Sequence, residues 1–177
     1  MVIDYIKKPS FELLAKGTNF ELRIYPPAKR TVKIVGRNYF LQFPYVIFGK
    51  YFVKDEGSWL HIAFTDRKLT RNSLSKMVYL PSVGNILSDY WYACLDFGPD
   101  GHYRQFHKLT FEDLICKFWN NEFSMEDSYE SPPLGGRYHA WQKMSLDEVL
   151  KAVSKIEYKM SLSRFIGIVR RKERHDF

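Results

Sequence analysis

Residues 45–64 read YVIFGKYFVKDEGSWLHIAF and predict the centre of the fold. Aromatic and β-branched side chains dominate residues 45–53 and 59–64, which is the composition of β-strands. The charged residues 54–56 and Gly57 between them have the composition of a turn. The stretch therefore predicts a β-hairpin.

The segments before this hairpin predict more strands. Alternation of apolar and polar residues predicts strands that end at Pro26-Pro27, at Gly36 and at Pro44: residues 20–25, 31–35 and 38–43. Residues 10–17 predict a short helix, because Ser10 can cap its start and Gly17 can end it. The first part of the chain is thus expected to be an antiparallel meander with a short helix before it.

Helices are predicted later in the chain. Thr110 and Asp113 form a capping-box pattern, and Ser145 and Glu148 form a second one in front of an apolar stripe at helical spacing. Residues 160–170 fit either an extension of the second helix or a last strand. Between the two helices, residues 120–136 are acidic and then rich in Pro and Gly, which indicates a flap or a partner loop.

These elements predict one α+β domain, with an antiparallel β-meander followed by packed C-terminal helices. The 177 residues are 45% hydrophobic and 27% charged and include two cysteines, which excludes a disordered chain, a collagen-like repeat and a disulfide scaffold. We expect a single domain over 1–177 with basic extensions at 1–19 and 160–177.

The net charge of +7 is concentrated near the two ends of the chain. Residues 1–40 and residues 151–177 each carry eight Lys and Arg against three acids, so the middle is negative. Basic ends of this kind can bind phosphate groups or an acidic protein surface, or they can be solvated tails. The candidate binding residues at the C-terminal end are Arg170, Arg171, Lys172 and Arg174.

Aromatic residues make up 17% of the chain, more than a small core needs. Some rings are therefore expected at a surface that meets a partner, and the candidates are Tyr45, Phe48 and Trp119. A second candidate cluster, Arg137, Tyr138 and Trp141, has two interpretations. It can stack on a base or a peptide, or it can anchor the long loop in front of it.

The sequence lacks the usual signatures of metal and cofactor sites. No Cys-x-x-Cys pair, phosphate-binding loop or dinucleotide fingerprint occurs, so we expect no metal and no cofactor. The start of the chain lacks the pattern of a secretory signal, and no apolar run approaches a membrane span. An intracellular or virion-associated protein without membrane contact is expected.

One cysteine lies in a pattern with chemical meaning. Pro81 and Asn85 precede Cys94, which begins a Cys-Leu-Asp triplet after a strand meander. This order of features resembles the ubiquitin-conjugating-enzyme-like superfamily. The resemblance implies that Cys94 carries a thioester and that Asn85 stabilises the oxyanion. Leu80 replaces the histidine of the family motif, and residues 82–84 are inserted within it.

The apolar neighbours of Cys94 support a different interpretation, in which the thiol is a buried core residue. Two further blocks, residues 43–49 and 118–123, resemble uncharacterised phage and mobile-element proteins, which implies a viral or plasmid setting. No constellation in the sequence joins nucleophile, base and oxyanion donor at a convincing spacing. We therefore expect a non-catalytic interaction or assembly module in a larger phage or mobile-element complex, with protein partners. The alternatives are a cysteine-dependent conjugating enzyme and a basic nucleic-acid-associated protein.

Overall fold

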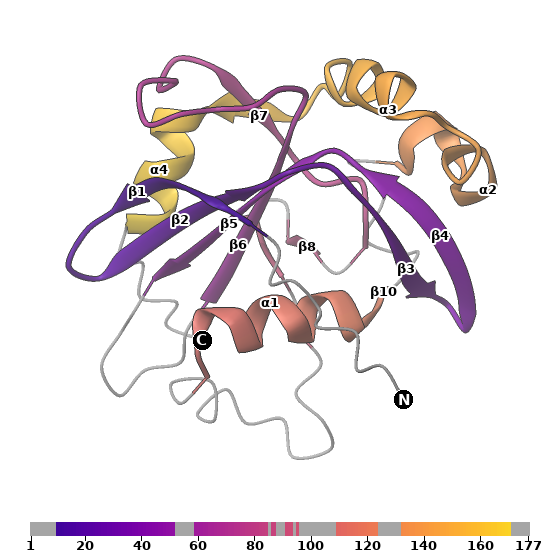
Figure 1. The fold of residues 1–177 in the computed structure, drawn as a ribbon, viewed down its shortest axis with the longest axis horizontal. Helices are drawn as coiled ribbons and strands as arrows, with labels where there is room; N and C mark the ends of the chain where they lie inside the picture. The colour runs from indigo at the N-terminus through magenta and orange to yellow at the C-terminus, as the bar shows by residue number, and fades with distance from the viewer. Residues whose placement is uncertain are drawn as a thin grey trace.

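Figure 1 shows the computed structural model, in which a large antiparallel sheet and a smaller three-stranded sheet pack with helices. The structure describes residues 10–51, 59–84, 86–87, 91–93, 95, 109–123 and 132–170. An antiparallel sheet of many strands followed by C-terminal helices is the fold that the sequence predicts, and in this respect the prediction is confirmed. No helix in the described part of the chain has the length and apolarity needed to cross a bilayer.

The predicted central hairpin forms the middle of the main sheet. Strand β5 (Tyr45–Tyr51) pairs antiparallel with β6 (Trp59–Thr65) along its whole length. The predicted turn at 54–57 lies outside the described residues. The order of the sheet is β1-β2-β5-β6-β7-β11, and its other strands are β1 (Glu12–Lys16), β2 (Phe20–Tyr25), β7 (Met77–Tyr79), β11 (Lys159–Ser161), β8 (Ile86–Leu87) and β9 (Tyr92–Ala93).

The predicted helix at 10–17 is wrong, because β1 occupies this segment as an edge strand. Residues 12–16 pair antiparallel with β2, and Leu14 is turned into the core. An isolated helix of this length is only marginally stable in water, whereas pairing with β2 supplies partners for the backbone. Gly17 still ends the element, because its N–H donates to the carbonyl of Phe20 in the turn that follows.

Strands β3 (Ala28–Ile34) and β4 (Arg37–Phe43) leave the main sheet and form a hairpin of their own. Prolines lie at both points of departure, Pro26-Pro27 before β3 and Pro44 after β4, and prolines have no N–H to give to a ladder. Val35 and Gly36, both at positive φ, make the two-residue turn. The short strand β10 (Glu122–Phe123) adds to β3 in parallel.

Helices cover both faces of the main sheet. Phe48 of β5 packs on Phe118 of α1 (Phe111–Asn120), whereas a Cβ on the next residue, Gly49, would meet Val169 of α4 (Leu162–Arg170). Consecutive residues of a strand face opposite ways, so α1 and α4 lie on opposite faces. The two smaller helices, α2 (Tyr138–Trp141) and α3 (Leu146–Val153), lie beside β4 in Figure 1.

Local signals in the second half predict the helices well. Both capping boxes are present, with Thr110 and Asp113 at α1 and with Ser145 and Glu148 at α3. Residues 160–170 contain both of the predicted alternatives, since β11 ends at Ser161 and α4 begins at Leu162. Within the predicted N-terminal extension, β1 belongs to the main sheet. Within the predicted C-terminal extension, the end of β11 belongs to the same sheet and α4 packs on it. Within the predicted loop at 120–136, the structure describes β10 and a 3-10 turn, Leu134–Gly136.

Candidate functional site

Three of the predicted binding aromatics are core residues. Phe48 is 1% exposed, Trp141 is 0% exposed and Tyr138 is 4% exposed. The prediction that these three rings face a partner is wrong, because both faces of β5 are covered and α2 is packed against the β3–β4 hairpin. Tyr45 and Trp119 are half-buried and pack against the same core.

The cluster around Trp141 anchors its segment to the hairpin, which is the second of the two predicted interpretations. The indole N–H of Trp141 donates to the carbonyl oxygen of Gln42 at 2.8 Å, and the side-chain oxygen of Gln142 accepts from the N–H of Phe40 at 3.2 Å. Both contacts satisfy backbone groups on the outer edge of β4. Arg137 is exposed at the N-cap of α2.

The basic and catalytic candidates are described only in part. Arg170 is exposed at the end of α4, with its guanidinium 5.3 Å from the centre of the Phe20 ring. Five other candidates lie outside the described residues: Asn85, Cys94, Arg171, Lys172 and Arg174.

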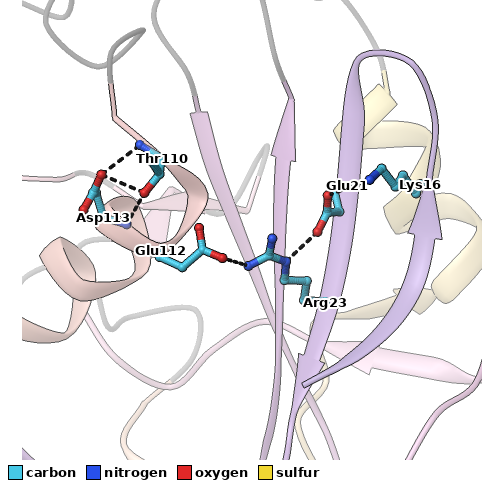
Figure 2. Close-up of polar contacts among 6 residues, drawn as sticks. All are labelled: Lys16, Glu21, Arg23, Thr110, Glu112 and Asp113. Atoms are coloured by element: carbon cyan, nitrogen blue, oxygen red, sulfur yellow. Dashed lines mark hydrogen bonds and ion pairs between the residues drawn. The ribbon is translucent and has the colours of Figure 1, made fainter. Parts of the chain in front are cut away.

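A partly buried charge network joins β2 to the start of α1 (Figure 2). The guanidinium of Arg23 donates to Glu21 at 2.5 Å and to Glu112 at 2.6 Å. It also lies between two rings, 4.3 Å from the centre of Phe11 and 4.5 Å from the centre of Phe111. The hydrogen bonds to the two carboxylates raise the pKa of Arg23 despite its burial.

Lys50 lies next to this network, opposite Glu21 in the pairing of β2 with β5. Its ammonium group donates to the carbonyl oxygen of Leu109 at 2.8 Å, and burial lowers its pKa. The lysine is only 3% exposed. The side chains of this region therefore bind one another and hold α1 on the sheet, and they do not present a nucleophile to solvent.

A shallow cavity of about 340 Å³ lies at the ends of β1, β2 and β5. Phe11, Tyr25 and Tyr45 supply its aromatic walls, and Glu12 and Lys68 form an ion pair at its edge. The predicted binding residue Tyr45 thus lines a hollow. In the described part of the chain no three metal-ligating side chains come together.

The outer face of the β3–β4 hairpin is an open surface that carries basic side chains and an exposed ring. Lys29, Thr31 and Lys33 of β3 project to it, and Asn38 and Phe40 of β4 lie opposite them. Phe40 is 52% exposed, and the ammonium group of Lys29 is 5.8 Å from the centre of its ring. This face combines positive charge with an aromatic ring that is free to stack.

The hairpin belongs to a long segment without acids. No Asp or Glu occurs between Leu22 and Lys54, whereas seven Lys and Arg do. A carboxylate from β10 contacts the hairpin: Glu122 is bound to Lys33 at 2.8 Å and accepts from the N–H of Gly36. Both contacts lower the pKa of Glu122. Neither Lys29 nor Arg37 has a carboxylate within ion-pair distance in the described part of the structure.

The inner face of the same hairpin carries a further cation, Arg30. Its guanidinium is 4.5 Å from the centre of the Trp119 ring on α1. Burial lowers the pKa of Arg30. The sequence analysis missed Lys29, Arg30 and Phe40, although the run from residue 22 to residue 54 without an acid is visible in the sequence and marks them.

No family model, curated protein or solved structure matches this chain.

Proposed function

We propose that the chain is a non-catalytic binding module that holds a nucleic acid against the outer face of the β3–β4 hairpin. The observation that carries this proposal is an open strand pair with no acid in its own sequence, which presents Lys29 and the exposed ring of Phe40 on its outer face and Arg37 beside its turn. The sequence analysis expects a non-catalytic module with protein partners and gives a basic nucleic-acid-associated protein as an alternative, and this proposal joins the non-catalytic role to that alternative ligand. The proposed surface is different, because most of the predicted aromatic candidates pack inside the chain.

Charge and shape both support a nucleic acid as the ligand. On the outer face Lys29 can neutralise a backbone phosphate, and Phe40 offers a face on which a base can stack. Arg37 pairs with Ile34 beside the turn and is exposed there, so it adds charge at the turn end of the hairpin. Arg137 and Lys143, exposed on and after α2, add charge beside β4, and residues 131–146 contain no acid. A two-stranded ribbon also fits the width of the DNA major groove, so single strands and duplexes are both to be tested.

The test is fluorescence anisotropy with a labelled oligothymidylate and with a labelled duplex, over a series of salt concentrations. We expect affinity to fall steeply as salt rises. The triple variant Lys29→Gln, Arg37→Gln, Phe40→Ala should bind about tenfold or more weakly and lower the slope of log affinity against log salt by about one to two.

A matched control variant removes the same kinds of side chain elsewhere. Lys151, Lys155 and Tyr158 are two exposed cations and an exposed ring on and after α3. The variant Lys151→Gln, Lys155→Gln, Tyr158→Ala should keep the affinity of the unchanged protein to within about a factor of three, since these residues lie outside the proposed surface. Equal losses in the two variants, or binding that does not depend on salt, would contradict the proposal.

The ubiquitin-conjugating-like resemblance remains a second proposal at the level of the fold. The support for it is the antiparallel order β1-β2-β5-β6-β7 with helix α1 following in the chain. Its chemistry rests on Cys94 and Asn85.

Alkylation of the folded protein tests this chemistry, with the exposed Cys116 as an internal reference. Modification of Cys94 at a rate similar to that of Cys116 would support the thioester role, and protection of Cys94 until denaturation would end it. The phage or mobile-element setting likewise stays a prediction.

A further inference from the structure

Two arginines reach α1 from the strands and stack on its rings. Arg23 of β2 lies over Phe111 in the first turn of the helix, and Arg30 of β3 lies over Trp119 in the last turn. In both cases the centre of the guanidinium is 4.5 Å from the centre of the ring. The two residues therefore provide an internal comparison of the same side chain in the same kind of contact.

The two arginines differ in their counter-charge. Arg23 donates to the carboxylates of Glu21 and Glu112. Around Arg30 the described residues place no carboxylate within ion-pair distance, and the ionisable groups that act on it are the thiol of Cys116 and the phenol of Tyr25. Accordingly, the pKa of Arg23 is raised and that of Arg30 is lowered.

A half-buried arginine without a carboxylate is poorly compensated. The guanidinium stays protonated at neutral pH, and stacking on Trp119 occupies one face of its plane but none of its N–H donors. Removing part of its hydration without an anion costs free energy, which an oxyanion at the edge of the plane would restore. Contact with the ring also restricts the side chain before an anion binds, so less freedom is lost on binding.

We propose that the Arg30 guanidinium, held against Trp119, binds the oxygens of a phosphate group. The phosphate is either free or part of a nucleic acid backbone, and in the second case the inference rests on the proposed function. Strand β10 pairs with β3 only at Lys33 and Ile34. The edge of β3 at residues 28–32 has no paired strand in the described structure, so a strand of nucleic acid passing this edge can contact Lys29 on one face and Arg30 on the other.

The test follows the Nε–Hε signals of the arginines by NMR in the full chain during titration with sodium phosphate, with sodium chloride as the reference salt. A second titration uses an oligothymidylate of about twelve nucleotides, within the range of site sizes for single strands. We expect the Arg30 signal to shift and to saturate with phosphate, and the Arg23 signal to stay unchanged because its donors are bound to carboxylates.

Variants separate a bound phosphate from general attraction. Arg30→Gln should weaken phosphate binding about tenfold, and Arg30→Lys should recover only part of it because a single ammonium group cannot bind two oxygens in a plane. Lys151→Gln removes an exposed positive charge on α3, outside the proposed surface, and should change phosphate binding less than about twofold. Thermal unfolding of each variant shows whether the fold is kept. If Arg30→Gln does not fold, the Arg30→Lys variant and the Arg30 signal of the unchanged protein decide the question.

The outcomes distinguish this inference from the proposed function. An Arg30 signal that does not respond to phosphate, or equal losses in Arg30→Gln and Lys151→Gln, would overturn the inference. If the oligonucleotide still bound in that case, the proposed function would stand without it. Phosphate binding at Arg30 with no affinity for the oligonucleotide would keep the inference for a free oxyanion and would refute the proposed function.

Discussion

Arg23 is a residue whose contacts reach from the first strand of the sheet to the first helix. Its guanidinium binds Glu21 and Glu112 and lies between the rings of Phe11 and Phe111. Because Glu21 is itself only 9% exposed, removing the cation leaves a poorly hydrated carboxylate. We expect Arg23→Gln to lower the free energy of unfolding by about 2–4 kcal/mol, measured by urea denaturation.

The carboxylate on the other side of Arg23 provides the control. The side chain of Glu112 is 54% exposed, so water replaces its contact with the guanidinium. Glu112→Gln should cost less than about 1 kcal/mol in the same denaturation experiment. Similar costs for the two variants would contradict this prediction, because they would show that leaving the buried Glu21 without its cation destabilises the protein no more than losing the exposed Glu112 contact.

At the scale of the elements, three carboxylates hold the ends of helices and strands. Asp113 and Glu148 complete the capping boxes of α1 and α3, and Glu122 of β10 binds Lys33 and the turn of the β3–β4 hairpin. Hydrogen bonds to Thr110, Ser145 and Lys33 respectively are the main causes that lower the three pKa values. A pKa that is lower in the folded state stabilises the fold only while the carboxylate is ionised.

These three groups predict how stability changes with pH. Their stabilisation is complete above the pKa values of the unfolded chain, at about 4, and is lost as the pH falls through the lower folded values. The variant Asp113→Asn, Glu122→Gln, Glu148→Gln should therefore lose less stability than the unchanged protein between neutral pH and acid pH. Urea denaturation across this range measures the difference, and parallel curves would show that the three carboxylates do not contribute to the acid sensitivity.

The capping boxes also show which elements the sequence can predict. Thr110 with Asp113, and Ser145 with Glu148, interact over three positions of the chain, and the pattern of residue types is enough to locate the two helices. The strand at 12–16 could not be found in this way, because its partners lie five to twelve positions further along the chain in β2 and its local signals suit a helix. Pairing with β2 outweighs the local preference of these residues for a helix.

The candidate surface could not be predicted from the sequence, for a related reason. Whether an aromatic ring faces solvent depends on contacts between distant segments, such as that of Trp141 with Gln42, which are 99 positions apart. Residue type alone therefore could not separate the exposed ring of Phe40 from the buried ring of Phe48. Charge was more informative, because the absence of acids from Leu22 to Lys54 is a property of the sequence itself. This acid-free run contains the hairpin, and it can be recognised without knowledge of the fold.

At the scale of the whole molecule, the close packing of α4 on β5 ties the C-terminal part of the chain to the centre of the sheet. A Cβ at Gly49 would lie 2.8 Å from Cγ2 of Val169 and 3.2 Å from its Cγ1. Gly49→Ala must therefore push α4 away from the sheet or distort β5. We expect a loss of about 1–3 kcal/mol in the free energy of unfolding, measured by urea denaturation.

Two companion variants test whether this contact is the cause. In a double-mutant cycle, Val169→Ala should reduce the cost of Gly49→Ala by about 1 kcal/mol, because the smaller side chain makes room for the added methyl group. Gly167→Ala makes the same substitution within α4, where an added Cβ would meet nothing within 4 Å. It should stabilise the protein by about 0.5–1 kcal/mol, since alanine is the better helix residue. Additive effects of Gly49→Ala and Val169→Ala would place the strain in β5 alone. Coupling between the two substitutions would show that the cost of Gly49→Ala comes from its contact with Val169 of α4.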